Sequence, residues 1–300
     1  MSLPQPPTAP ALPRCYRHPD RETGRSCTRC GKPACSDCLV QATVGSHCLD
    51  CARAARPDVR TRATYWKAKQ QALLTTVLIG VNVLVFLYTT LQDTGSLSGR
   101  GTLSRAQCGL GLNKFVLADG GICGGKLYDS GEWYRLVTAG FLHFGVIHIA
   151  FNMLLLYQLG QLLERALGPV RFGLLYAAGL LAGSAGVLVA DSSGITGGAS
   201  GAVFGLMAAA AVGLHRQGVN VFSTGIGTTL LLNLFLTFAI PGISVGGHLG
   251  GAVGGAICGF LMMPPRWQPY PKWVTYATPV AVLVISVVAC VILVQSASVG

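Results

Sequence analysis

Seven apolar segments constrain the fold more than any other feature of this sequence. They cover residues 71–91, 146–164, 170–190, 200–215, 221–240, 246–263 and 274–295. A helix needs about 20 apolar residues to cross the hydrocarbon core of a bilayer, and most segments are close to that length. Only 11% of the residues are charged, which is unlike a water-soluble domain. The sequence therefore predicts an all-α, multi-pass protein of a cell membrane with seven transmembrane helices.

The Lys and Arg residues between the segments predict the orientation of the chain. They precede the first segment and follow the second, fourth and sixth (Arg53, Arg56, Arg60, Arg62, Lys67, Lys69, Arg165, Arg171, Arg216, Arg266 and Lys272). Because basic loops stay on the cytoplasmic side, we expect a cytoplasmic N-terminus and a C-terminus outside. Basic residues beside a membrane favour anionic lipid over nucleic acid as a partner, so no nucleic acid is expected.

The region before the first apolar segment predicts a separate small domain. About seventy polar, Cys-rich and basic residues precede the first apolar segment, whereas a cleaved signal peptide has its apolar part near the N-terminus. We therefore expect the first segment to be a retained helix. The predicted organisation is a disordered Pro-rich tail over 1–14, a Cys/His domain over 15–51, a basic juxtamembrane linker over 52–70 and a membrane domain over 71–296.

Four Cys/His pairs between residues 15 and 51 predict metal binding. They are Cys15-x2-His18, Cys27-x2-Cys30, Cys35-x2-Cys38 and Cys48-x2-Cys51. A two-residue gap lets both donors of a pair face one ion, and eight donors suffice for two tetrahedral structural zinc ions. A redox site, an iron–sulfur site or unligated thiols are the alternatives. A module this short cannot fold on its own core, so the metal is expected to supply the folding energy.

The same four pairs resemble a B-box-type, cross-braced zinc finger. The resemblance implies that one ion is shared by Cys15, His18, Cys35 and Cys38, and the other by Cys27, Cys30, Cys48 and Cys51. His47 could replace Cys48 in the second set. It further implies a cytoplasmic protein partner and no catalytic role for the finger.

Two further cysteines, Cys108 and Cys123, lie in the long glycine-rich loop over 92–142. On the outside of the membrane such a pair is expected to form a disulfide, with two free thiols as the alternative. Cys258 and Cys290 lie in apolar segments and are expected only to pack.

Polar residues inside the apolar segments predict a functional site. His148 and Asn152 are four residues apart and share one helix face, Ser200 begins the fourth segment, and His248 lies in the sixth. Small residues recur every four positions from Gly201 in the fourth segment and from Gly247 in the sixth. This spacing lets the helices of these two segments pack closely. Ser200 and His248 would then meet near the outer end of both helices, as a nucleophile beside a base.

The spacing alone equally allows Ser200 to be a packing residue and His248 a structural hydrogen-bond partner. Ser200, however, also begins a helix, where free backbone N–H groups and the helix dipole favour a developing negative charge. His148 and Asn152 could add side-chain donors to the same anion. Together these residues predict acyl-transfer chemistry.

At these residues the chain resembles the rhomboid intramembrane serine proteases, over roughly 71–296. The resemblance rests on Gly198-Ala199-Ser200-Gly201, the stretch from His143 to Asn152, His248-Leu-Gly-Gly251, Glu132-Trp-Tyr-Arg135 and Glu164-Arg165. It implies a six-helix core with a seventh C-terminal helix, a catalytic pair of Ser200 and His248, and no catalytic cofactor. It implies that the oxyanion is held by His148, Asn152 and the backbone at Gly198 and Ser200.

The resemblance also implies supporting residues, namely His143, Trp133, Arg135, Glu164, Phe204 and Gly251. Arg135 and its aromatic neighbours would anchor the loop in the outer leaflet, Glu164 would tether helices, and the fifth segment would be a lateral gate. Two positions depart from the family pattern: Phe204 stands where the family often has Tyr, and Tyr134 where it often has Trp. The G-x-S-x-G motif of soluble hydrolases does not fit, because Ala202 occupies its last position.

The expected substrate is a transmembrane helix of another membrane protein, cut near its outer end at small residues such as Gly or Ala. One alternative is a catalytically inactive rhomboid-like scaffold or chaperone, although such a protein normally lacks the serine or the histidine. A transporter or channel is a third possibility, but it predicts polar groups along a whole path rather than at one side.

Overall fold

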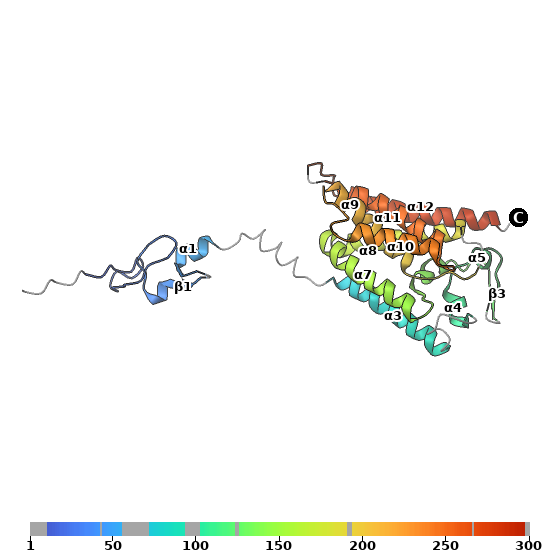
Figure 1. The fold of residues 1–300 in the computed structure, drawn as a ribbon, viewed down its shortest axis with the longest axis horizontal. Coiled ribbons are helices and arrows are strands. Elements are labelled where there is room, and N and C mark those ends of the chain that lie inside the picture. The colour runs from blue at the N-terminus through green and yellow to red at the C-terminus, as the bar shows by residue number, and fades with distance from the viewer. Residues whose placement is uncertain are drawn as a thin grey trace, which may run out of the picture. The chain divides into compact units, whose positions relative to one another are not determined.

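The computed structural model describes residues 11–42, 44–55, 72–93, 103–123, 126–190, 194–265 and 267–297, and only the backbone of residues 122, 123 and 126–128. The chain forms two compact units, Met1–Lys69 and Gln70–Gly300 (Figure 1). Most of the expected tail and linker, and Arg266, lie outside the described residues.

The small unit contains little regular structure. Its elements are η1 (Ser36–Cys38), β1 (Leu39–Gln41), β2 (Ser46–Cys48) and α1 (Leu49–Ala54), and β1 pairs with β2 in an antiparallel hairpin. Its hydrophobic cluster consists of Cys15, Ala34, Cys35 and Cys38, with three partly buried apolar neighbours. Such a core is too small to offset the entropy of ordering the chain, so a further stabilising element is required.

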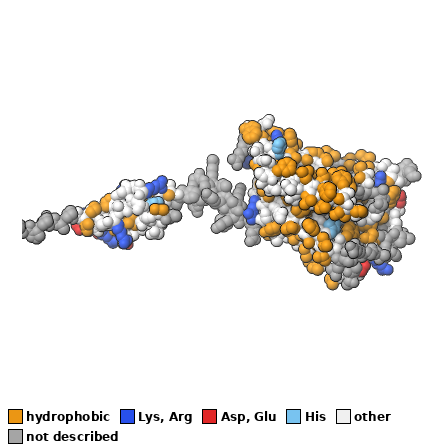
Figure 2. Space-filling view, in the orientation of Figure 1, with side chains coloured by type: hydrophobic (Ala, Val, Ile, Leu, Met, Phe, Trp, Pro, Cys, Tyr) orange, Lys and Arg blue, Asp and Glu red, His pale blue; other side chains and the backbone are white. Residues whose placement is uncertain are grey.

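Seven helices of the large unit coincide with the seven apolar segments (Figure 1). They are α3 (Leu73–Gln92), α7 (Val146–Leu167), α8 (Pro169–Ala190), α9 (Ser200–Arg216), α10 (Ile226–Ala239), α11 (Val245–Met262) and α12 (Val274–Ala297). Five are long and apolar enough to cross a membrane: α3, α7, α8, α11 and α12. Hydrophobic side chains cover much of the visible face of this unit (Figure 2). The prediction of an all-α, multi-pass membrane fold is confirmed.

The fifth helix begins later than its apolar segment suggests. Residues 221–225 form turns, and α10 starts at Ile226 after Gly225, whose φ is +77°. The reason is local polar chemistry, because the Asn220 side chain accepts from the Phe222 N–H and the Ser223 hydroxyl donates to the Asn220 carbonyl. Such side-chain bonds compete with helix formation.

Glycines bring α9, α8 and α11 into close contact, as their spacing predicts. A β-carbon at Gly251 would overlap the carbonyl oxygen of Gly201, and one at Gly255 would overlap that of Gly205. A β-carbon at Gly186 of α8 would likewise overlap the carbonyl oxygen of Gly246. The backbones of these helices are therefore in direct contact, which places the start of α9 beside the start of α11.

The loop between α3 and α7 has structure of its own. It contains α4 (Arg105–Leu110), α5 (Lys114–Asp119), the hairpin β3 (Gly121–Cys123) and β4 (Lys126–Tyr128), α6 (Arg135–Thr138) and η3 (Ala139–Phe141). Helix caps define two of these pieces: Ser104 and Gln107 form a capping box on α4, and the Asn113 side chain caps α5. The described part of this loop is thus built from short regular elements that are held by their own caps and by the hairpin.

Candidate active site

Ser200 is the first residue of α9 and is half-buried. As the first helical residue it has no intrahelical partner for its backbone N–H. Its side chain lines a cavity of about 40 Å³ together with residues such as Thr196, Gly198, Ser244 and Gly247. A space of this size is large enough for a water molecule beside the serine, although apolar residues such as Leu180 and Val187 also line it.

His248 lies in the first turn of α11 and is buried. The Phe204 ring, one turn after Ser200, stacks on the imidazole with ring centroids 4.1 Å apart and planes inclined by 19°. The Thr237 hydroxyl oxygen of α10 lies 2.7 Å from His248 Nδ1. The absence of the tyrosine hydroxyl at Phe204 therefore leaves the stacking contact intact.

The crossing of α9 and α11 brings Ser200 and His248 to one site. Each is adjacent in the chain to a glycine of the crossing, Gly201 and Gly247, and a β-carbon at Gly201 would lie 3.3 Å from the Gly247 carbonyl oxygen. Among the hydrogen bonds of the described residues, none joins Ser200 to His248. Catalytic hydrogen bonds are often long before substrate binds.

His148 also lies close to Ser200. A β-carbon at Gly198 would stand 3.0 Å from His148 Nε2 and 3.3 Å from the Ser200 hydroxyl oxygen, so only glycine fits between them. The backbone N–H of Phe144 donates to His148 Nδ1 at 3.3 Å. Because Nδ1 accepts, the proton of the neutral ring is on Nε2, which makes that nitrogen a donor directed at the serine.

Two other residues expected to hold an oxyanion differ in what they offer. The buried Asn152 amide donates to the His148 carbonyl oxygen at 3.0 Å, and its second proton remains able to donate. The N–H of Gly198 donates to the Ala139 carbonyl oxygen at 2.8 Å. The expectation that the Gly198 backbone donates to an oxyanion is therefore wrong, because that proton is already used; the residue instead provides space.

His143 holds the segment before Ser200. It is fully buried, its Nε2 accepts from the Ala199 N–H at 3.5 Å, and its Nδ1 faces the Phe141 carbonyl oxygen at 3.3 Å. Its ring also meets the His148 ring edge-on at 5.0 Å. The residue thus connects the backbone at the serine to the histidine beside it.

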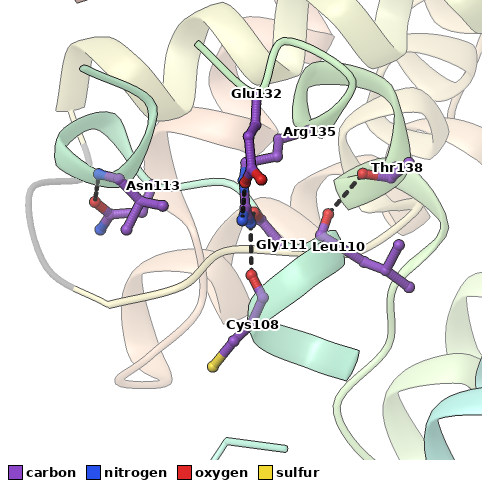
Figure 3. A network of polar contacts seen from close by, with 8 residues as sticks. Cys108, Leu110, Gly111, Asn113, Glu132, Arg135 and Thr138 are labelled. Carbon is purple, nitrogen blue, oxygen red and sulfur yellow. Dashed lines mark hydrogen bonds and ion pairs between the residues drawn. The ribbon is translucent and has the colours of Figure 1, made fainter. Parts of the chain in front are cut away.

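Arg135 organises the outer loop from within (Figure 3). Its side chain is 0% exposed, it pairs with Glu132, and it donates to the carbonyl oxygens of Cys108 and Gly111. The Thr138 hydroxyl adds a bond to the Leu110 carbonyl oxygen at 2.8 Å. Its guanidinium thus holds the loop through buried acceptors, and the anchoring of this loop in the outer leaflet stays a prediction.

The aromatic neighbours of Arg135 are exposed, as an interfacial position requires: Trp133 by 39% and Tyr134 by 48%. The loop that Arg135 holds continues toward the serine. Leu112 and Thr196 exchange two backbone hydrogen bonds of 2.8 Å, and Thr196 lies four residues before Ser200. The arginine therefore supports the serine segment through the backbone.

Glu164 joins α7 to the beginning of α3. Its carboxylate accepts from the backbone N–H groups of Leu74 and Thr75 at 2.9 and 2.8 Å, and from the Thr75 hydroxyl at 2.7 Å. The free N–H groups and the dipole of a helix N-terminus favour such a carboxylate. This contact is the helix tether that the family resemblance implies.

Two clusters in the small unit are able to hold metal ions. The ligand atoms in each lie within 4.8 Å of one another, and the clusters are Cys15, His18, Cys35, Cys38 and Cys27, Cys30, Cys48, Cys51. These are the two sets that the resemblance to a cross-braced finger implies. His47 is not part of either set; it lies on β2 opposite Val40.

The spacing of the ligand atoms fits tetrahedral coordination. Bond lengths of about 2.3 Å to sulfur and about 2.0 Å to nitrogen separate two sulfurs by about 3.8 Å, and sulfur from nitrogen by about 3.5 Å. The Sγ atoms of Cys30 and Cys48 are 3.7 Å apart. His18 Nδ1 lies 3.3 Å from Cys35 Sγ and 3.4 Å from Cys38 Sγ.

The thiols of the second cluster have unequal proton affinities. Hydrogen bonding to the backbone at Cys48 lowers the pKa of Cys27 to about 6. Hydrogen bonds with the side chains of Cys30 and Cys48 raise the pKa of Cys51 to about 12. Four thiolates at this distance require a cation to neutralise them, which is the chemistry of a metal site.

The cysteines of the outer loop are described only in part. Cys108 is buried and disulfide-bonded. The side chain of Cys123 lies outside the described residues, so its pairing with Cys108 stays a prediction. Cys258 and Cys290 are fully buried free thiols between helices, as expected for packing residues.

Thr237 is the site residue that sequence patterns did not identify. A lone threonine in an apolar helix usually donates to its own backbone, and its sequence gives no sign of a second partner.

Comparison with known proteins places this site in context. A family model of the rhomboid domain matches residues 130–265, which include Ser200, His148 and His248. The chain is 37% identical over 127 residues to rhomboid protease GluP of Bacillus subtilis, covering 41% of this chain and 25% of that protein. It is 32% identical over 154 residues to RHOMBOID-like protein 4 of Arabidopsis thaliana, covering 48% and 38%.

A third relative, rhomboid-type serine protease 2 of Emericella nidulans, is 32% identical over 153 residues, covering 47% of this chain and 29% of that protein. The matches to these three relatives thus span less than half of each relative's length. The match to the rhomboid-domain model lies within the helical unit. The helical unit therefore contains a rhomboid domain, over residues 130–265.

Proposed function

We propose that this protein is an intramembrane serine endopeptidase that cleaves transmembrane segments of other membrane proteins near the outer face. The observation that carries the proposal is the arrangement around Ser200: the N-terminus of α9, a nearby His148 that acts as a donor, and a buried His248 stacked on Phe204 one turn after the serine. Nucleophile, base and anion donors converge on one point, as acyl transfer requires.

In the proposed reaction, Ser200 Oγ bonds to the scissile carbonyl carbon as His248 Nε2 takes the hydroxyl proton. The backbone N–H of Ser200 and the side chains of His148 and Asn152 donate to the resulting oxyanion. His248 then gives its proton to the leaving amine as the C–N bond breaks. Water, deprotonated by His248, attacks the acyl-enzyme, and the proton returns to Ser200 as the ester bond breaks.

The proposed substrate enters sideways between α7 and α10. Of the residues of α10, only Gly227 and Thr237 are buried, so this helix has little packing to lose when it moves. The narrow space at the glycine-rich crossing favours Gly or Ala at the cut.

The proposal is tested by labelling the purified, detergent-solubilised protein with a fluorophosphonate probe. The wild type is expected to react, and Ser200→Ala and His248→Ala are expected not to. Reaction of Ser200→Ala would assign the label to another residue, and an unreactive wild type with native helicity would reject the protease.

An inactive rhomboid-like scaffold that binds transmembrane helices is the second candidate. It is favoured by one observation: no hydrogen bond joins Ser200 to His248 among the described residues. Under this alternative the wild type retains helix binding, for example to a fluorescent transmembrane peptide in vesicles, and binding is unaffected by Ser200→Ala, while no cleavage product forms.

For the N-terminal unit we propose two structural zinc ions in a domain over 15–51, with the protease domain over 71–296. Six of the cysteine ligands are buried or half-buried, and the distances between ligand atoms are close to those of tetrahedral coordination. Thiolate ligands in this geometry favour zinc over harder cations. The proposed orientation keeps this unit cytoplasmic, where it could recruit a protein partner, and puts Ser200 on the outer side. Accessibility of single introduced cysteines to an impermeant maleimide tests the orientation.

A further inference from the structure

Helix α10 has two buried residues, Gly227 and Thr237. Because glycine has no side chain, Thr237 has the only buried side chain of this helix. The larger side chains of α10 point outward: Leu231, Leu232, Phe235 and Phe238 are each more than half exposed. The only buried side chain of a loosely packed helix is therefore directed at His248.

The hydrogen bonds of Thr237 can be assigned completely. Its hydroxyl donates to the Asn233 carbonyl oxygen at 2.8 Å, and its oxygen lies 2.7 Å from His248 Nδ1. A hydroxyl has one proton and two lone pairs, so a proton given to Asn233 is not available for the imidazole. His248 Nδ1 must then be the donor, and the proton of the neutral ring is on Nδ1.

This assignment is opposite to that of His148, whose Nδ1 accepts from a backbone N–H. His148 therefore presents an N–H at Nε2, and His248 presents a lone pair there. A base needs the lone pair and an anion donor needs the N–H. The backbone N–H of Phe144 and the hydroxyl of Thr237 thus fix opposite tautomers of the two histidines and give them different functions.

We propose that Thr237 is a positioning residue that holds His248 with Nδ1 protonated and Nε2 free to take the Ser200 proton. The proposal rests on the proposed protease function for its catalytic consequence, but not for the tautomer itself. Thr237 orients the base without the charge of a carboxylate, while Phe204 fixes the plane of the ring.

The location of Thr237 on α10 adds a second consequence. If α10 moves away from α11, the hydroxyl leaves Nδ1 and the imidazole loses its only described orienting hydrogen bond. The base is then aligned only while α10 is closed. Admission of a substrate and activation of the serine become separate steps, which prevents attack on a helix that is still entering.

The tautomer is measured on the full-length protein in micelles, labelled with ¹⁵N-histidine, by two-bond ¹H–¹⁵N correlation spectra. His248→Gln assigns the resonance. We expect Nδ1–H in the wild type and in Thr237→Ser, and a mixture of tautomers in Thr237→Val. An Nε2–H tautomer in the wild type, or an unchanged spectrum in Thr237→Val, would overturn the proposal whether or not the protein is an enzyme.

The catalytic consequence is measured as the rate of fluorophosphonate labelling. Thr237→Val, which keeps the shape but not the hydroxyl, is expected to react about 10- to 100-fold more slowly. Thr237→Ser should recover to within about 3-fold of the wild type. Equal loss in both variants would indicate packing rather than hydrogen bonding and would contradict the proposal.

Thr278→Val is the matched control. Thr278 is a buried threonine of α12 whose hydroxyl donates to the carbonyl four residues earlier, at the same 2.8 Å as Thr237, and no hydrogen bond of the described residues joins it to a histidine. This variant should label like the wild type. If neither the wild type nor any variant is labelled, but the tautomers are as expected, the protease function is rejected and the Nδ1–H tautomer of His248 still holds.

Discussion

Gly198 and His148 are in such close contact that a β-carbon at residue 198 would stand 3.0 Å from the imidazole Nε2. The backbone of Gly198 also has a φ of +146°, which disfavours any side chain. Gly198→Ala is therefore expected to push His148 away from Ser200 and to slow fluorophosphonate labelling by about 100-fold or more.

Gly194→Ala separates the two effects of that substitution. Gly194 has a φ of +83° but nothing within 4 Å of an added β-carbon. It should lower thermal stability through backbone strain and leave the labelling rate unchanged. Equal loss of labelling in both variants would show that strain in the loop, rather than displacement of His148, is responsible.

Removal of an oxyanion donor should affect kcat rather than KM. Asn152→Leu and His148→Phe each delete a donor near Ser200, and loss of one such donor costs about 100- to 1,000-fold in kcat. The measurement is steady-state cleavage of a transmembrane substrate reconstituted in vesicles. An unchanged kcat with a raised KM would assign these residues to substrate binding.

Glu164→Ala should destabilise the helical unit. The substitution leaves two backbone N–H groups at the start of α3 and the Thr75 hydroxyl without their acceptor, and a hydrogen bond typically contributes about 1 kcal/mol to stability. We expect the free energy of unfolding in mixed micelles to fall by about 3 kcal/mol. Thr75→Val, which removes one of the three bonds, should cost about a third as much; equal losses would contradict an additive tether.

Removal of metal should unfold the small unit and leave the helical unit folded. Elemental analysis is expected to give two zinc ions per chain, and one in Cys38→Ser. A chelator should make residues 11–55 sensitive to protease while the helical circular dichroism persists. A protease-resistant small unit after complete metal removal would contradict the structural role.

The metal should also be lost as the pH falls. Metal-bound thiolates have pKa values far below those of the free thiols, such as Cys51, whose pKa is raised to about 12 by the side chains of Cys30 and Cys48. The stability that the metal contributes is therefore present at neutral pH and disappears in acid, when protons displace the ion. A titration of bound zinc against pH measures this; retention of both ions at pH 4 would contradict it.

The features that followed from sequence are those that repeat or that have a fixed spacing. Apolar length identified the long helices, the two-residue gaps identified the two Cys/His clusters, and glycines every four residues identified the α9–α11 contact. Each of these signals is written along one element, so periodicity is sufficient to find it.

The features that were missed depend on partners far away in the chain. Arg135 is buried because two backbone carbonyls receive it, and carbonyls leave no trace in a sequence. The N–H of Gly198 is occupied by the carbonyl of Ala139 for the same kind of reason. Thr237 resembles any threonine in an apolar helix until α11 brings His248 to it.

The short length of α10 has a consequence for the surrounding lipid. Its 14 residues extend about 21 Å along the helix axis, whereas the hydrocarbon core of a bilayer is about 30 Å thick. Acyl chains beside α10 must compress or disorder to match it. A transmembrane helix longer than α10 that diffuses into this thinner lipid has its end exposed to water before it contacts the protein. A helix end in water unwinds more readily than one in lipid, because water can satisfy the freed backbone groups.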